Sequence, residues 1–134
     1  MKAKAIKITT DNKLLIIDVP RKASSLLETL KKEIGGWVEL VSPRTFHTIE
    51  YLQEKVMVVD EDGICKGKKP NRIATDLYGN YSTIAGDVLI LKYITTEDGM
   101  DVGGLTENEA DQLYAYLAVR YDLIKKLNGG NKNE

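Results

Sequence analysis

Residues 55–60 read Lys-Val-Met-Val-Val-Asp and residues 88–91 read Val-Leu-Ile-Leu, and these two short runs decide the fold. Each run is apolar and lies next to turn-forming residues, Asp62-Gly63 after the first and Gly86-Asp87 before the second. Short apolar runs of this kind, the first of them rich in β-branched residues, favour central strands that are buried on both faces. We therefore expect both runs to lie in the middle of one sheet.

Further strand patterns surround these two runs. Residues 3–9 and 14–19 are expected to form a β-hairpin, and residues 37–41 should add another strand. A turn over residues 60–63 is predicted to lead into a short return strand at 64–66. The sheet should therefore contain about five strands and be mixed or mainly antiparallel.

Two helices are expected to pack on this sheet. The capping-box spacing of Ser25 and Glu28 predicts a helix that ends before Gly35-Gly36. A second capping-box pair, Thr106 and Glu109, opens the longest helix, which we expect to end near Leu127. Between the last strand and this helix, a mobile loop is predicted, since the segment is rich in glycine and acidic residues.

These patterns predict an α+β fold with its two main helices near residues 25–34 and 107–127. The length of 134 residues fits a single domain, which we expect over residues 1–130 with a disordered tail at 131–134. The side chains expected in the core are Ile6, Leu15, Leu30, Val58, Leu89 and Leu117.

The composition is that of a folded protein, with 43% apolar and 29% charged residues. Nineteen basic and twenty acidic residues give a net charge of -1, which disfavours nucleic acid as a partner. The first ten residues lack a continuous apolar run, so no secretory signal is expected there. No membrane span is expected, because no stretch approaches the ~20 apolar residues that crossing a bilayer requires. A cytoplasmic location follows as the simplest expectation.

Candidate catalytic and metal-binding residues are few. His47, the single histidine, lies in a polar stretch without a clear carboxylate partner, and Cys65, the single cysteine, favours a packed side chain over a nucleophile. Residues 60–62 are three consecutive acids in a turn, a spacing that differs from the alternate ligands of a calcium loop. We therefore expect no enzyme activity, no metal and no cofactor.

The strongest candidate site is the basic loop from Lys66 to Arg72. It combines cations with an amide and a stiffening proline, and two tyrosines follow that could stack on a ring. The candidate ligand-binding residues are Lys66, Lys68, Lys69, Asn71, Arg72, Tyr78 and Tyr81. The alternative is a solvated connection in which Asn71 caps the helix that begins near Ile73.

The C-terminal helix carries a wider apolar surface than one sheet face needs. Its surplus stripe contains Tyr116, Val119 and Leu123, which would suit an interface, including one between copies of the chain in a homo-oligomer. The alternative is that the helix lies in a groove between the sheet and the first helix.

An ordered set of short motifs also carries a family resemblance. Gly-Gly-Trp-Val-Glu at 35–39, Val-Val-Asp-Glu-Asp-Gly at 58–63, Pro-Asn-Arg at 70–72 and Ile-Ala-Gly-Asp-Val at 84–88 lie in this order. Over about residues 3–118 the chain resembles a domain-of-unknown-function family of small proteins from phages, plasmids and low-GC Gram-positive bacteria. The resemblance implies a mobile-element setting, without a known cofactor or established activity.

Two functions remain open at this point. The first is a non-enzymatic phage or mobile-element accessory protein that binds an anionic small molecule, such as a nucleotide-type defence signal. The second is a protein-interaction module that binds a host or phage protein through the C-terminal helix. An enzyme that uses His47 or acidic residues ranks third.

Overall fold

The computed structural model describes residues 2–122, in which six strands form one antiparallel sheet. The strands are β1 (Ala3–Ile8), β2 (Leu14–Val19), β3 (Val38–Val41), β4 (Lys55–Asp60), β5 (Val88–Thr96) and β6 (Gly99–Gly103). Their order is β2-β1-β5-β4-β3, and β6 pairs with the far end of β5. The helices are α1 (Ala23–Ile34), α2 (Thr45–Thr48), α3 (Arg72–Leu77) and α4 (Glu107–Arg120), with a 3-10 helix η1 at Glu50–Leu52. The predicted α+β fold is confirmed.

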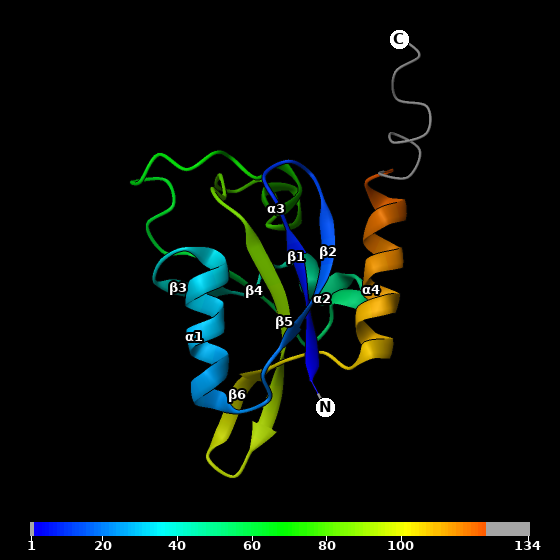
Figure 1. Ribbon diagram of the computed structural model, residues 1–134. Helices are drawn as coiled ribbons and strands as arrows, with labels where there is room; N and C mark the ends of the chain where they lie inside the picture. Colours follow the sequence, from blue (N-terminus) through cyan, green and yellow to red (C-terminus); the bar gives the residue numbers. More distant parts are fainter. Residues whose placement is uncertain (1, 123–134) are drawn as a thin grey trace.

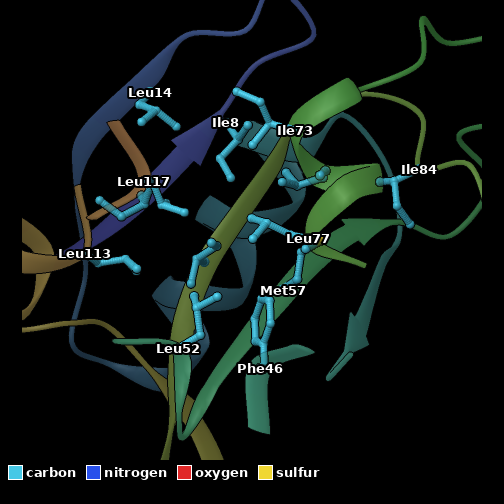
Figure 2. Close-up of a cluster of buried hydrophobic side chains, with 14 of the residues drawn as sticks. Ile8, Leu14, Phe46, Leu52, Met57, Ile73, Leu77, Ile84, Leu113 and Leu117 are labelled. Atoms are coloured by element: carbon cyan, nitrogen blue, oxygen red, sulfur yellow. The ribbon is translucent and has the colours of Figure 1, made fainter. Parts of the chain in front are cut away.

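Helices cover both faces of the sheet, with α1 on one side and α4 on the other (Figure 1). Along β4, Val56 and Val58 belong to the apolar cluster under α1, whereas Met57 and Val59 belong to the cluster that includes α2, α3 and α4. In Figure 2, Leu113 and Leu117 of α4 lie in this second cluster. The runs at 55–60 and 88–91 are therefore central strands buried on both faces, as predicted.

Five of the six predicted core residues are buried, and Leu15 is the exception at 43% exposure. In the register of β1 and β2, Leu14 pairs with the buried Ile8 and Leu15 pairs with Lys7. Because β2 is an edge strand, its α1-side face at Leu15 remains partly open to solvent. Leu14, whose side chain points to the opposite face, takes the core position.

Two sequence-based assignments of irregular and extended segments were wrong. The segment expected to be a mobile loop forms a hairpin, in which Thr96 at the end of β5 pairs with Gly99 at the start of β6. Residues 64–66, expected as a short return strand, lie in a series of turns. Residues 61–67 form backbone hydrogen bonds within the segment, such as Lys66 N to Asp62 O. These local bonds replace the bonds to a neighbouring strand that a β-strand would need.

The two helix starts differ in how they are capped. Thr106 and Glu109 form the expected capping box of α4. The other predicted box is wrong, since the N-cap of α1 is Lys22, three residues before Ser25, and it has no side-chain cap. The helix α4 is assigned to Arg120, and the positions from 123 onward, including the expected helix end at Leu127 and the tail at 131–134, lie outside the described residues.

Among residues 2–122, no helix has the length and apolarity required to cross a membrane.

Candidate functional site

The basic loop leaves the sheet at Asp60, the last residue of β4, whose carboxylate is fully buried. Oδ2 of Asp60 lies 2.5 Å from Lys68 Nζ and 3.0 Å from Lys66 Nζ, and Oδ1 accepts the Asp62 amide at 2.8 Å. Burial raises the pKa of Asp60, but the hydrogen bonds from Lys68, Asp62 and Lys66 outweigh burial and hold the pKa below its ordinary value. Asp60 is therefore the anion that organises two of the four cations in the loop.

The same two lysines cap the C-terminus of α1. Lys68 Nζ donates to the carbonyl of Ile34 at 2.7 Å, and Lys66 Nζ donates to the carbonyl of Gly35 at 3.3 Å. A cation is favourable at this end of a helix because the last carbonyls lack helical partners. Lys66 and Lys68, predicted to bind a ligand, are thus already engaged by the protein.

Glycines make room for these lysines. A Cβ on Gly36 would collide with Lys66 Nζ and would lie 3.0 Å from Asp60 Oδ2. A Cβ on Gly86 would lie 2.9 Å from Lys68 Cδ, and its φ of +92° also favours glycine. The motifs at 35–39, 58–63 and 84–88, which are separate in the sequence, therefore meet around one ion cluster, in which Asp60 is buried and the two lysines are partly exposed.

Asn71 stabilises the fold through buried hydrogen bonds. Its side chain is fully buried, Nδ2 donates to the carbonyls of Ile8 and Gly86, and Oδ1 accepts the Ala74 amide as the N-cap of α3. These bonds join β1, the turn before β5 and α3. The predicted role of Asn71 in orienting a ligand does not fit this position, and its capping role, the stated alternative, is present.

The remaining two cations face solvent. Lys69 makes an exposed 3.3 Å ion pair with Asp11 in the turn between β1 and β2. Arg72 is exposed at the start of α3, and its guanidinium has no hydrogen bond or ion pair within residues 2–122. Arg72 is thus the cation of the loop whose side chain is open to a ligand without breaking a contact among residues 2–122.

The two predicted tyrosines lie at the other end of α3. Tyr78 is half-buried and packs against the core, and the ring of Tyr81, 69% exposed, meets it edge-on with centroids 6.3 Å apart. Since α3 has six residues, its axis separates Arg72 from this pair by about 9 Å. The predicted site residues therefore form a surface along α3 and the loop before it, and they do not enclose one pocket.

A small cavity that sequence reasoning missed lies beside the β3 edge. It has a volume of about 180 Å³ and includes Glu39 of β3, Glu61 after β4, Tyr78 and residues 82–85 in its lining. Both glutamates are exposed, and their carboxylates have no hydrogen bond or ion pair in the described part of the chain. The alternation around Glu39 was a usable signal, because it placed this acid on one face of a strand.

The two weaker catalytic candidates, His47 and Cys65, lie in different parts of the structure. His47 is exposed on α2 and lines a separate cavity with Tyr93 and Met100, whereas Cys65 is exposed in the turns after β4. Within residues 2–122, no three His, Cys, Asp or Glu side chains are placed to hold a metal ion.

One of the three residues of the predicted interface on α4 is already packed within the chain. Tyr116 packs on Tyr51 with ring centroids 5.3 Å apart, and its hydroxyl accepts a 2.9 Å hydrogen bond from Arg120. Val119 is 79% exposed. Leu123, the third predicted residue, lies outside the described residues.

The fold and loop define a class: a small α+β domain whose antiparallel sheet is covered on both faces and whose basic loop is anchored on a buried aspartate. A family model described as "Domain of unknown function (DUF3846)" matches residues 1–118, and the chain belongs to this family. The expected membership in a domain-of-unknown-function family is confirmed at that level. No curated protein matches the chain.

One solved structure shares the fold. The crystal structure of small RNA methyltransferase HEN1 superposes with a TM-score of 0.52 at 13% sequence identity, over 82% of this chain. The chain spans only 15% of the length of that methyltransferase chain. At this identity the similarity concerns the fold alone.

Proposed function

We propose that this protein is a non-enzymatic accessory protein of a phage or other mobile element that binds an anionic small molecule on the surface around Arg72. The observation that carries the proposal is the exposed Arg72 guanidinium, which has no protein partner among residues 2–122. A guanidinium binds phosphate or carboxylate oxygens through paired hydrogen bonds.

The charge of the loop supports an anionic ligand. The ion pairs of this segment join three lysines, Lys66, Lys68 and Lys69, to two carboxylates, Asp60 and Asp11. Arg72 adds a fourth cation, which has no ion pair among residues 2–122. Residues 60–72 carry these four cations and three acids, Asp60, Glu61 and Asp62, so the segment has a formal charge of +1 in a chain whose net charge is -1. Such a local field attracts anions from solution, and salt weakens the attraction.

The distance along α3 supports a nucleotide-type ligand. Arg72 begins α3, which is about 9 Å long, and the exposed ring of Tyr81 contacts Tyr78 just beyond the other end of this helix. A ligand with a phosphate at one end and a flat base at the other could reach both. Tyr81 would then stack on the base, the role predicted from the sequence.

A thermal-shift screen tests the proposal. Nucleotides, cyclic dinucleotides, ADP-ribose derivatives and inorganic pyrophosphate are compared with the uncharged nucleosides. A ligand at a hundred times its Kd should add about 2.7 kcal/mol to the free energy of unfolding, and added salt should reduce the shift. Equal shifts for nucleotide and nucleoside, or none for any anion at millimolar concentration, would contradict the proposal.

A second candidate is binding of a host or phage protein through α4, and the 79% exposure of Val119 favours it. The two candidates use different surfaces. Loss of partner binding in Val119→Glu with retention in Arg72→Ala would favour the α4 surface, and the reverse pattern would favour the anion site.

A further inference from the structure

The sheet ends at β3, whose outer edge has no neighbouring strand in the described residues. The Glu61 amide donates to the Trp37 carbonyl at 2.9 Å, so these residues form a hydrogen-bonded pair. Because hydrogen-bonded and non-hydrogen-bonded pairs alternate in an antiparallel ladder, Glu39 and Val41 also bond to β4. The backbone groups of Val38 and Leu40 therefore point away from the sheet.

The side chains along this edge differ between the two faces of the sheet. Leu40 shares the α1 face with Val58 and is 45% exposed. Trp37, just before the strand, is 65% exposed and lies beside α1, where Lys31 Nζ is 4.2 Å from the centroid of its ring. On the opposite face, Glu39 and Glu61 line the cavity of about 180 Å³ beside β3. The edge thus combines unpaired backbone groups, an apolar face and an acidic cavity.

Pairing with a second copy of the chain is disfavoured at this edge. In an antiparallel pair of two β3 strands, the outward backbone groups of Val38 in one copy would bond to those of Leu40 in the other. This register places Glu39 directly opposite Glu39 of the other copy. Like charges opposite each other, with Cβ atoms about 5 Å apart, destabilise a strand pair. The same acidic side chains favour a basic partner strand.

We propose that the outer edge of β3 binds an extended basic segment of another protein as an added strand. Main-chain hydrogen bonds would form to Val38 and Leu40. Alternate side chains of the partner would be lysine or arginine, directed at Glu39 and Glu61, and apolar residues, packed near Leu40 and Trp37. This surface does not include Arg72, so the proposal does not rest on anion binding there.

The probe is a short, end-blocked peptide that alternates lysine with valine. Nuclear magnetic resonance measures amide hydrogen exchange of the full chain with and without this peptide, and fluorescence anisotropy measures its affinity. The amides of Val38 and Leu40 should exchange at least about tenfold more slowly in the complex. Glu39→Lys should weaken binding about tenfold, whereas Ile16→Lys on the opposite edge strand, β2, should leave it unchanged.

Two control peptides separate the contribution of charge from that of main-chain hydrogen bonding. Replacing each lysine by glutamate should abolish binding, and placing proline at alternate positions should abolish the protection of Val38 and Leu40, because proline cannot donate. If Glu39→Lys perturbs the structure of β3, Glu61→Lys is used in its place, because Glu61 lines the same cavity from the adjacent turn. Unchanged exchange at both amides, equal affinity for the glutamate peptide, or peptide-free protection that grows with protein concentration would each overturn the proposal.

Discussion

Asn71→Ala should lower the free energy of unfolding by about 3 kcal/mol. The substitution removes the N-cap of α3, worth about 1 kcal/mol, and leaves the carbonyls of Ile8 and Gly86 without their Asn71 donors inside the protein. Because these bonds connect β1, the turn before β5 and α3, the substitution should lower the stability of the whole domain. Urea unfolding monitored by circular dichroism measures the change.

Thr106→Ala is the matched control for Asn71→Ala. Thr106 is also an N-cap, but its side chain is exposed and accepts only the Glu109 amide, so this variant should lose about 1 kcal/mol. The difference between the two variants isolates the buried bonds to the carbonyls. Equal losses in the two variants would show that Asn71 acts as a cap alone.

Asp60→Asn should also cost about 3 kcal/mol, since it removes the one anion that both Lys66 and Lys68 contact. The amide of asparagine would present hydrogens to two ammonium groups. The lysines are partly exposed and can turn toward water, which keeps the loss below that of a fully buried pair. Glu61→Gln, at an exposed neighbouring carboxylate, should change stability by less than about 0.5 kcal/mol.

The pH dependence of stability provides a second readout for Asp60. Because its pKa in the folded protein lies below the ordinary value of 3.8, the unfolded chain binds the proton first as the pH falls. The stabilisation from Asp60 is thus fully present above about pH 4 and is lost as the pH falls through the folded pKa. The difference in stability between wild type and Asp60→Asn should shrink in this acid range, and a constant difference would contradict the ion-cluster account.

Much of the fold was predictable because it depends on local patterns. The apolar runs at 55–60 and 88–91 are long enough to mark central strands, and Thr106 with Glu109 marks a helix start by itself. Leu15 was not predictable, since Leu14 and Leu15 are both apolar and only the pairing register with Ile8 and Lys7 decides which is buried. The β5–β6 hairpin was missed because its residues are polar and glycine-rich.

The candidate site was predictable in location but not in the roles of its residues. The sequence places four cations near Asn71, yet it cannot show that Asp60, six residues before Lys66, lies between Lys66 and Lys68. The hydrogen bonding of the buried Asn71 side chain depends on the Ile8 carbonyl of β1, more than sixty residues away. Long-range contacts therefore fix Lys66, Lys68 and Asn71 in the structure, whereas Arg72 stays exposed.

The central claim is that Arg72 binds the anionic group of a small ligand, and isothermal titration of two matched variants tests it most directly. Arg44→Ala is the control, since Arg44 is also exposed and its guanidinium has no hydrogen bond or ion pair within residues 2–122. With the nucleotide that gives the largest thermal shift, Arg72→Ala should weaken binding at least about a hundredfold, from loss of paired charge-assisted bonds, with stability within about 0.5 kcal/mol of wild type. Arg44→Ala should bind like wild type. Equal affinities of Arg72→Ala and wild type, or unfolding of Arg72→Ala, would contradict the account.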